Sequence, residues 1–142
     1  MSKYIDKVFI YADGGCKPNP GIMVGSFLIT DGTNILTGPK GKIFGPGTNV
    51  LAEFRAISLG LDEAVSYTRR KVVILCDNKF VIEALRKDKR IHKDHLKTIL
   101  IEIYNKTSMF EEVEYIHVSE KNKFIKKCDE KCAELFNQLG GI

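Results

Sequence analysis

The chain has 142 residues, of which 44% are hydrophobic and 28% charged, so we expect one globular domain covering residues 1–142. No apolar run approaches the roughly 20 residues that cross a bilayer, and the polar residues 1–7 are not typical of a signal peptide. These features predict a cytoplasmic, free-standing monomer with no membrane partner. A net charge of +4 is compatible with a polyanionic partner but does not require one.

The first part of the chain has the pattern of β-strands. A run rich in β-formers at residues 4–13 predicts the first strand, and the glycine- and proline-rich residues 14–21 predict a turn. A second strand is expected at 23–30, a hairpin turn at 31–34, and a third strand at 35–44.

The pattern changes to mostly helical after Gly47. Apolar residues at helical spacing predict a helix over 50–67, and the continuous apolar run 72–75 predicts a strand buried on both faces. The remaining expected elements are helices at 80–86, around 96–103 and at 125–139, and a strand at 113–118. The order βββαβααβα implies an α/β fold: a five-stranded mixed sheet with helices on its faces.

The four cysteines, Cys16, Cys76, Cys128 and Cys132, form no CxxC pair. Cys128 and Cys132 are four positions apart, which would place them on one helix face. They could bind metal in principle, but no second pair stands at zinc-finger spacing. We therefore expect reduced, structural thiols.

Two aspartates stand at the ends of predicted strands. Asp13 ends the first strand and Asp77 follows the fourth, and the two would lie side by side if these strands are neighbours. The alternative is that Asp is simply a common residue after a strand, with Asp77 as a helix N-cap before Asn78.

Two further acids lie in predicted helices. Glu53 shares its helix side with Ala56, Ile57 and Gly60, so we expect it to face the sheet, where an unpaired carboxylate needs a cation. Asp129, in the last helix, is the fourth candidate. For either residue alone, a solvated charge is the alternative. Such hard oxygen ligands suit Mg²⁺ or Mn²⁺ rather than zinc, and two ions about 3.5–4 Å apart can drive phosphodiester hydrolysis.

Four segments resemble the motifs of type 1 ribonuclease H, in the same order and on the expected elements. They are residues 13–21 (DGGCKPNPG), 48–53 (TNVLAE), 75–79 (LCDNK) and 127–133 (KCDEKCA). The resemblance covers about residues 5–138. It implies a ribonuclease H-like fold with helices on both faces of the sheet.

The resemblance also implies an activity: endonucleolytic hydrolysis of the RNA strand of an RNA–DNA hybrid, leaving 5′-phosphate and 3′-hydroxyl ends. The implied catalytic and metal-binding residues are Asp13, Glu53, Asp77 and Asp129. The implied cofactor is Mg²⁺, two ions per site, with Mn²⁺ as a substitute.

The resemblance further implies that Asn19 and Asn49, with backbone groups near Cys16, contact the 2′-hydroxyl groups that distinguish RNA from DNA. An amide side chain can both donate to and accept from a hydroxyl. For Asn19 the alternative is a turn residue before Pro20. The full set of expected substrate-binding residues is Gly14, Cys16, Asn19, Thr48, Asn49 and Asn78.

The sequence departs from the family pattern at four positions. Val50 replaces a polar residue, and Pro46 stands where many members have a phosphate-binding Arg. Ser119 stands where the family often has a loop His, and Ile125 where it has an Asn. His117 is the remaining candidate for proton handling. Catalytic efficiency is therefore harder to predict than metal binding.

A group of basic residues lies in the second half of the chain: Arg86, Lys87, Lys89, Arg90, Lys93 and Lys97. It indicates either a surface that follows nucleic-acid phosphates or an ordinary solvated helix face.

Two alternatives to the hybrid-specific nuclease remain. One is a nucleic-acid-binding domain of this fold with weak or no catalysis, which the departures favour and the intact acids oppose. The other is a junction resolvase or 3′–5′ exonuclease. An exonuclease would carry Asp-x-Glu in its first strand, but Gly14 and Gly15 follow Asp13 here.

Overall fold

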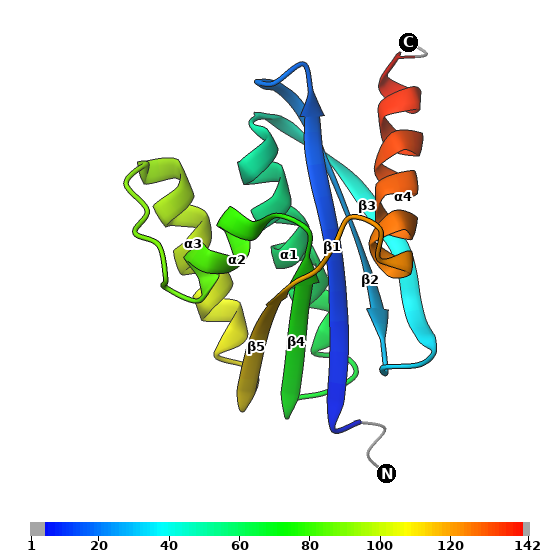
Figure 1. The fold of residues 1–142 in the computed structure, drawn as a ribbon, viewed down its shortest axis with the longest axis vertical. Coiled ribbons are helices and arrows are strands. Elements are labelled where there is room, and N and C mark those ends of the chain that lie inside the picture. Colours follow the sequence, from blue (N-terminus) through cyan, green and yellow to red (C-terminus); the bar gives the residue numbers. More distant parts are fainter. Residues whose placement is uncertain (1–4, 141–142) are drawn as a thin grey trace.

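A five-stranded mixed sheet forms the centre of the computed structural model, which describes residues 5–140 (Figure 1). Tyr4, the expected start of the first strand, lies outside the described residues, as do the other residues before Ile5. The strands are β1 (Lys7–Lys17), β2 (Gly21–Thr30), β3 (Ile35–Gly47), β4 (Lys71–Cys76) and β5 (Glu112–His117), in the spatial order β3-β2-β1-β4-β5. The first three strands are antiparallel, whereas β1, β4 and β5 run parallel.

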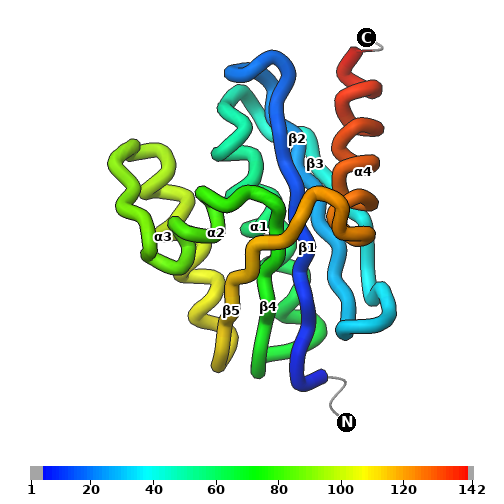
Figure 2. Tube along the Cα trace, in the orientation of Figure 1, coloured from blue at the N-terminus to red at the C-terminus, as the bar shows by residue number. Residues whose placement is uncertain are grey.

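Helices cover both faces of this sheet, as predicted. Helices α1 (Asn49–Ala64), α2 (Lys79–Leu85) and α3 (Asp94–Thr107) lie on one side, and α4 (Lys123–Gly140) packs on the other, against β1, β2 and β3 (Figures 1 and 2). The predicted order βββαβααβα is therefore confirmed. No helix in the described part of the chain combines the length and the apolar character needed to cross a membrane.

The central strands divide their side chains between two cores because successive residues of a strand point to opposite faces. In β4, Val72 and Ile74 pack in the core under α1, whereas Val73 and Leu75 pack in the core under α4. The prediction that residues 72–75 form a strand buried on both faces is confirmed.

The prediction of a turn over residues 14–21 is wrong in length, because the turn is shorter than expected. Strand β1 continues through both glycines to Lys17, which pairs with Ile22 of β2, and only residues 18–20 form the turn. Gly14 keeps the strand close to α1, because a Cβ there would lie 2.5 Å from the Ala52 carbonyl oxygen. Asp13 consequently lies within β1, just beyond Tyr11, the last residue that pairs with β4.

The helix boundaries follow local capping. Thr48 accepts a hydrogen bond from the Leu51 N–H (3.2 Å), so α1 begins at Asn49. The helix ends at Ala64, three residues before the predicted end at residue 67. Asn122 accepts from the N–H groups of Phe124 (2.9 Å) and Ile125 (3.1 Å), which fixes the start of α4.

Candidate active site

Three of the four predicted acids converge where β4 ends. Asp13 comes from β1, Glu53 from α1 and Asp77 from the position directly after β4, and one carboxylate oxygen of each lies within 4.8 Å of the others. The parallel pairing of β1 with β4 brings the two aspartates together, as the sequence predicted. The predicted inward orientation of Glu53 is also confirmed, because this residue is only 6% exposed.

The Glu53 carboxylate is only partly satisfied by the protein. The Gly14 N–H donates to Oε1 (3.3 Å), whereas Oε2 is buried without a hydrogen-bond partner among the described residues. A buried carboxylate oxygen without a partner is costly, and a cation at this point would remove the cost. This oxygen therefore fits a metal ion shared with the two neighbouring aspartates.

Burial and mutual repulsion raise the pKa values of all three acids. The pKa of Asp13 rises to about 7, mainly through burial and further through the negative charges of Asp77 and Asp129. Burial, followed by the charge of Asp13, raises the pKa of Glu53 well above its usual range. Burial is also the main cause of the raised pKa of Asp77, with Glu120 and Asp129 adding to it. A divalent cation would stabilise the charged forms of such a cluster.

Asp129 approaches the cluster from the opposite side of the sheet. It lies on α4 and is exposed, but it is near enough to raise the pKa of Asp13. Glu53 comes from α1 on the other face. Asp129 is exposed to solvent, as the alternative of a solvated charge predicts. It nevertheless lies beside the other three acids.

The predicted substrate-binding asparagines form a connected group next to the acids. The Asn49 Oδ1 accepts from the Cys16 N–H (2.8 Å), and the Asn19 Oδ1 accepts from both the Asn49 N–H (3.2 Å) and the Cys16 thiol (3.3 Å). Both amide oxygens are therefore engaged within the protein. The side chains offer a ligand their NH₂ groups, which act only as donors.

Thr48 and Asn78, which the sequence placed among the substrate-binding residues, are helix caps in the structure. Asn78 accepts from the Val81 N–H (3.1 Å) at the start of α2, so Asp77 is not the cap of that helix. The side chain of Asp77 is thereby available to the acid cluster.

The end of β5 and the segment that follows it lie beside Asp77. The His117 Nε2 lies 3.2 Å from the Asp77 carbonyl oxygen, and Ser119 accepts from the Lys121 N–H (3.1 Å). Sequence reasoning missed Glu120, whose charge acts on Asp77. Its place beside Ser119, in the loop where the family often has a His, was the available signal.

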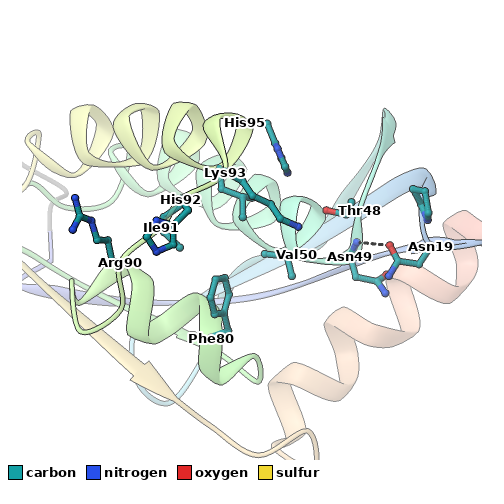
Figure 3. Close-up of a pocket in the computed structure, with 12 residues that line it drawn as sticks. Asn19, Thr48, Asn49, Val50, Phe80, Arg90, Ile91, His92, Lys93 and His95 are labelled. Carbon is teal, nitrogen blue, oxygen red and sulfur yellow. Dashed lines mark hydrogen bonds between the residues drawn. The ribbon is translucent and has the colours of Figure 1, made fainter.

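An open groove of about 630 Å³ extends from the asparagines towards α3 (Figure 3). Asn19, Asn49 and Val50 line one side, and Arg90 and Lys93 line the other. The lining also contains Phe80, Ile91, His92 and His95. Sequence reasoning missed the two histidines, although His92 stands next to Lys93 in the loop before α3 and His95 lies in the first turn of that helix.

Half of the predicted basic group makes contacts within the protein. The Arg86 guanidinium donates to the Tyr115 carbonyl, Lys87 lies over the Tyr104 ring at 5.1 Å, and Lys89 lies 3.7 Å from Glu83. Arg90 and Lys93 are the members of the group that line the groove. Of the basic group, these two residues are therefore the ones placed to contact phosphates of a nucleic acid lying in this groove.

All four cysteines are free and buried, which agrees with the prediction of reduced structural thiols. Burial raises the pKa of Cys132 to about 12 and those of Cys76 and Cys128 further. These three thiols therefore stay protonated near neutral pH.

Among solved structures, the fold is similar to the N-terminal RNase H domain of Rv2228c from Mycobacterium tuberculosis, solved as a fusion with maltose-binding protein. That match has a TM-score of 0.78 and 27% identity over 87% of this chain and 97% of that one. RNase H1 from the halophilic archaeon Halobacterium salinarum has a TM-score of 0.81 at 19% identity, over 90% and 98% of the two chains. LC11-RNase H1 in complex with an RNA/DNA hybrid has a TM-score of 0.77 at 19% identity, over 91% and 99%.

Sequence comparison gives the same grouping. The bifunctional protein Rv2228c of Mycobacterium tuberculosis is 29% identical over 110 residues, which are 77% of this chain but 30% of that protein. The chain thus matches less than a third of the length of this curated relative. The profile of the family described as reverse transcriptase-like matches residues 12–132, a span that includes all four acids. The chain therefore belongs to the reverse transcriptase-like family of ribonuclease H domains.

Proposed function

We propose that this protein is an endonuclease that hydrolyses the RNA strand of RNA–DNA hybrids with the help of divalent metal ions. The observation that carries the proposal is the convergence of Asp13, Glu53 and Asp77 around a buried carboxylate oxygen without a partner. A ribonuclease H1 of the same fold was solved in complex with an RNA/DNA hybrid, which supports this substrate class.

Asp13, Glu53, Asp77 and Asp129 would hold the metal. Carboxylates are hard oxygen ligands, which favour Mg²⁺, with Mn²⁺ as a substitute. When bound, such ions, two per site in the proposed mechanism, lower the pKa of water and stabilise the leaving oxygen of a phosphodiester. The chain itself supplies the four carboxylates and the buried surroundings that strengthen their hold on a cation.

Other residues would bind and orient the hybrid. The NH₂ groups of Asn19 and Asn49 would donate to 2′-hydroxyl oxygens of the RNA strand, close to the acids. Arg90 and Lys93, across the groove, would contact phosphates of the duplex. His117, next to the backbone of Asp77, would handle a proton during hydrolysis or product release.

A second candidate is a hybrid-binding domain with weak or no catalysis. It is favoured by Ser119, which stands in the loop where the family often has a titratable side chain and is hydrogen-bonded to Lys121. The convergence of the acids favours the nuclease, because a protein that only binds has no need of a buried cluster of negative charge.

One assay separates the candidates. Purified protein is incubated with Mg²⁺ and matched RNA–DNA, RNA–RNA and DNA–DNA duplexes that carry a labelled strand. The nuclease is expected to cut only the RNA of the hybrid and to leave 5′-phosphate ends, whereas Asp77→Asn should bind the hybrid without cutting it. Binding without cleavage by the wild-type protein would support the second candidate instead.

We also propose that one copy of the chain is sufficient for the proposed activity, because the acids, the asparagines and the groove all come from a single chain. Sedimentation of the protein with and without a hybrid would test for a monomer. Cytoplasmic location stays a proposal from the sequence, and a fluorescent fusion would test it.

A further inference from the structure

The position of Asp129 depends on where α4 lies along the sheet. Its side chain is exposed, and among residues 5–140 no ion pair includes it. The backbone of α4 therefore determines how close this carboxylate comes to Asp13. Any contact that fixes α4 along β1 also fixes the fourth acid of the cluster.

A group of buried polar contacts ties α4 to β1 and β2 on both sides of Asp129. The Cys128 thiol donates to the Tyr11 carbonyl (3.5 Å), and the Cys132 thiol donates to the Asp13 carbonyl (3.6 Å). The Ser26 hydroxyl donates to the Cys128 carbonyl (2.6 Å) and lies 3.4 Å from the Cys132 sulfur. One thiol thus precedes Asp129 by one residue and the other follows it by three.

These contacts restrain α4 in a way that apolar packing does not. The rest of the interface consists of side chains such as Phe124, Ile125 and Leu135, and apolar burial has no preferred direction. Hydrogen bonds depend on both distance and angle, so they resist sliding of the helix along the strand. Ser26 is completely buried and pairs directly with Asp13 in the β1–β2 ladder.

We propose that Ser26 and Cys132 are positioning residues for the metal site: they hold α4 so that Asp129 stays beside Asp13. The inference rests on the proposed function, because Asp129 must help to bind the metal. It assigns a role to a serine and a thiol that contact neither the metal nor the hybrid.

The test measures metal binding directly, on the full chain without a hybrid, by calorimetric titration with Mn²⁺. Asp129→Asn sets the effect of losing the fourth acid. Ser26→Ala and Cys132→Ala should each weaken Mn²⁺ binding by about twofold to tenfold, the factor for one lost hydrogen bond. Cys132→Ser keeps a donor towards the Asp13 carbonyl and should recover part of the loss.

Ser58→Ala is the matched control, because Ser58 is also buried and donates to Glu102 (2.6 Å), but on α1 and towards α3. It should lower the melting temperature, as Ser26→Ala should, and leave Mn²⁺ affinity unchanged. The KM for the hybrid should stay at its wild-type value in Ser26→Ala, while the Mg²⁺ concentration for half-maximal cleavage rises.

Two results would overturn the proposal. One is wild-type Mn²⁺ affinity in both Ser26→Ala and Cys132→Ala, and the other is wild-type affinity in Asp129→Asn. If the wild-type protein binds Mn²⁺ but does not cut hybrids, the proposed function fails, while the calorimetric comparison still decides the positioning role.

Discussion

The pKa values of Asp13, Glu53 and Asp77 are raised, so their protonated forms are favoured more in the folded protein than in water. Burial is the main cause for Asp13, Glu53 and Asp77, and negative neighbours add to it. Without a metal ion, ionising these groups therefore lowers the stability of the folded protein. The residues best suited to bind a cation are thus a source of instability when no cation is present.

Asp77→Asn is expected to abolish cleavage and to raise the melting temperature of the metal-free protein. The pKa of Asp77 is raised in the folded state, so its stabilising contribution is complete below the unfolded pKa of about 4. That contribution is lost as the pH rises through the folded pKa, so the advantage of the variant should grow from acidic to neutral pH.

Melting curves in EDTA at several pH values would measure this difference, and Mg²⁺ should stabilise the wild type more than the variant. Full cleavage by Asp77→Asn would remove this residue from the site. A variant less stable than the wild type at neutral pH would contradict the electrostatic argument.

Asn49→Asp tests the polarity of the amide group. The substitution keeps an oxygen that can accept from the Cys16 N–H but removes the NH₂ donor. Loss of a donor to a 2′-hydroxyl should slow hybrid cleavage by up to about tenfold, and repulsion between the added carboxylate and the phosphates of the hybrid should slow it further. Melting temperature serves as the control for folding, and unchanged cleavage at subsaturating hybrid would contradict the assigned role.

A pair of variants can distinguish the contributions of His117 and Ser119 to proton handling. A serine hydroxyl does not titrate near neutral pH, so we expect slow steady-state turnover that Ser119→His increases. His117→Ala should reduce turnover if the side chain beside Asp77 already handles protons. Turnover with Mg²⁺ is measured for both at the same hybrid concentration, and no change in either variant would exclude both roles.

At the scale of elements, the loop between α2 and α3 forms one side of the groove. Neutralising Arg90 and Lys93 should weaken binding to hybrids of every sequence. It should also flatten the plot of the logarithm of the binding constant against the logarithm of the salt concentration, whose slope changes by about 0.9 per phosphate contact on duplex DNA. Lys89→Ala is the matched control, because Lys89 pairs with Glu83 and does not line the groove. Equal slopes for Arg90→Ala, Lys93→Ala and Lys89→Ala would make the loop an ordinary surface.

The elements also show how far the sequence can predict this structure. Periodicity and turn residues predicted, in order, the nine elements that residues 5–140 form, because strands and helices place their apolar residues at different spacings. The four motifs and their order identified the four acids as candidate site residues. The extent of β1 was missed, because glycines usually mark turns and only the approach of α1 to Gly14 explains a strand there.

The details of the site depend on contacts between distant residues, which no local pattern encodes. The amide oxygens of Asn19 and Asn49 are engaged by groups from two elements, so their donor-only character required the structure. The partners of Arg86, Lys87 and Lys89 likewise come from other segments. The sequence could predict a basic group but not which members remain available to phosphates.

For the whole molecule, metal binding and folding should be linked. A cation that binds only the folded state raises stability by about 2.7 kcal/mol at a concentration 100 times its dissociation constant. Urea unfolding followed by circular dichroism should therefore show a midpoint that rises with Mg²⁺ concentration. The same titration on Asp13→Asn should give a smaller slope, and equal slopes would place the ion elsewhere.

The approach of Glu53 and Asp129 from opposite faces of the sheet has a consequence for protein synthesis. A nascent chain that has passed β4 and Asp77 already contains three of the acids, but α4 follows later in the chain, after β5. Until that helix docks, the cluster lacks its fourth carboxylate. The proposed nuclease activity should therefore appear only after α4 has left the ribosome and docked on the sheet.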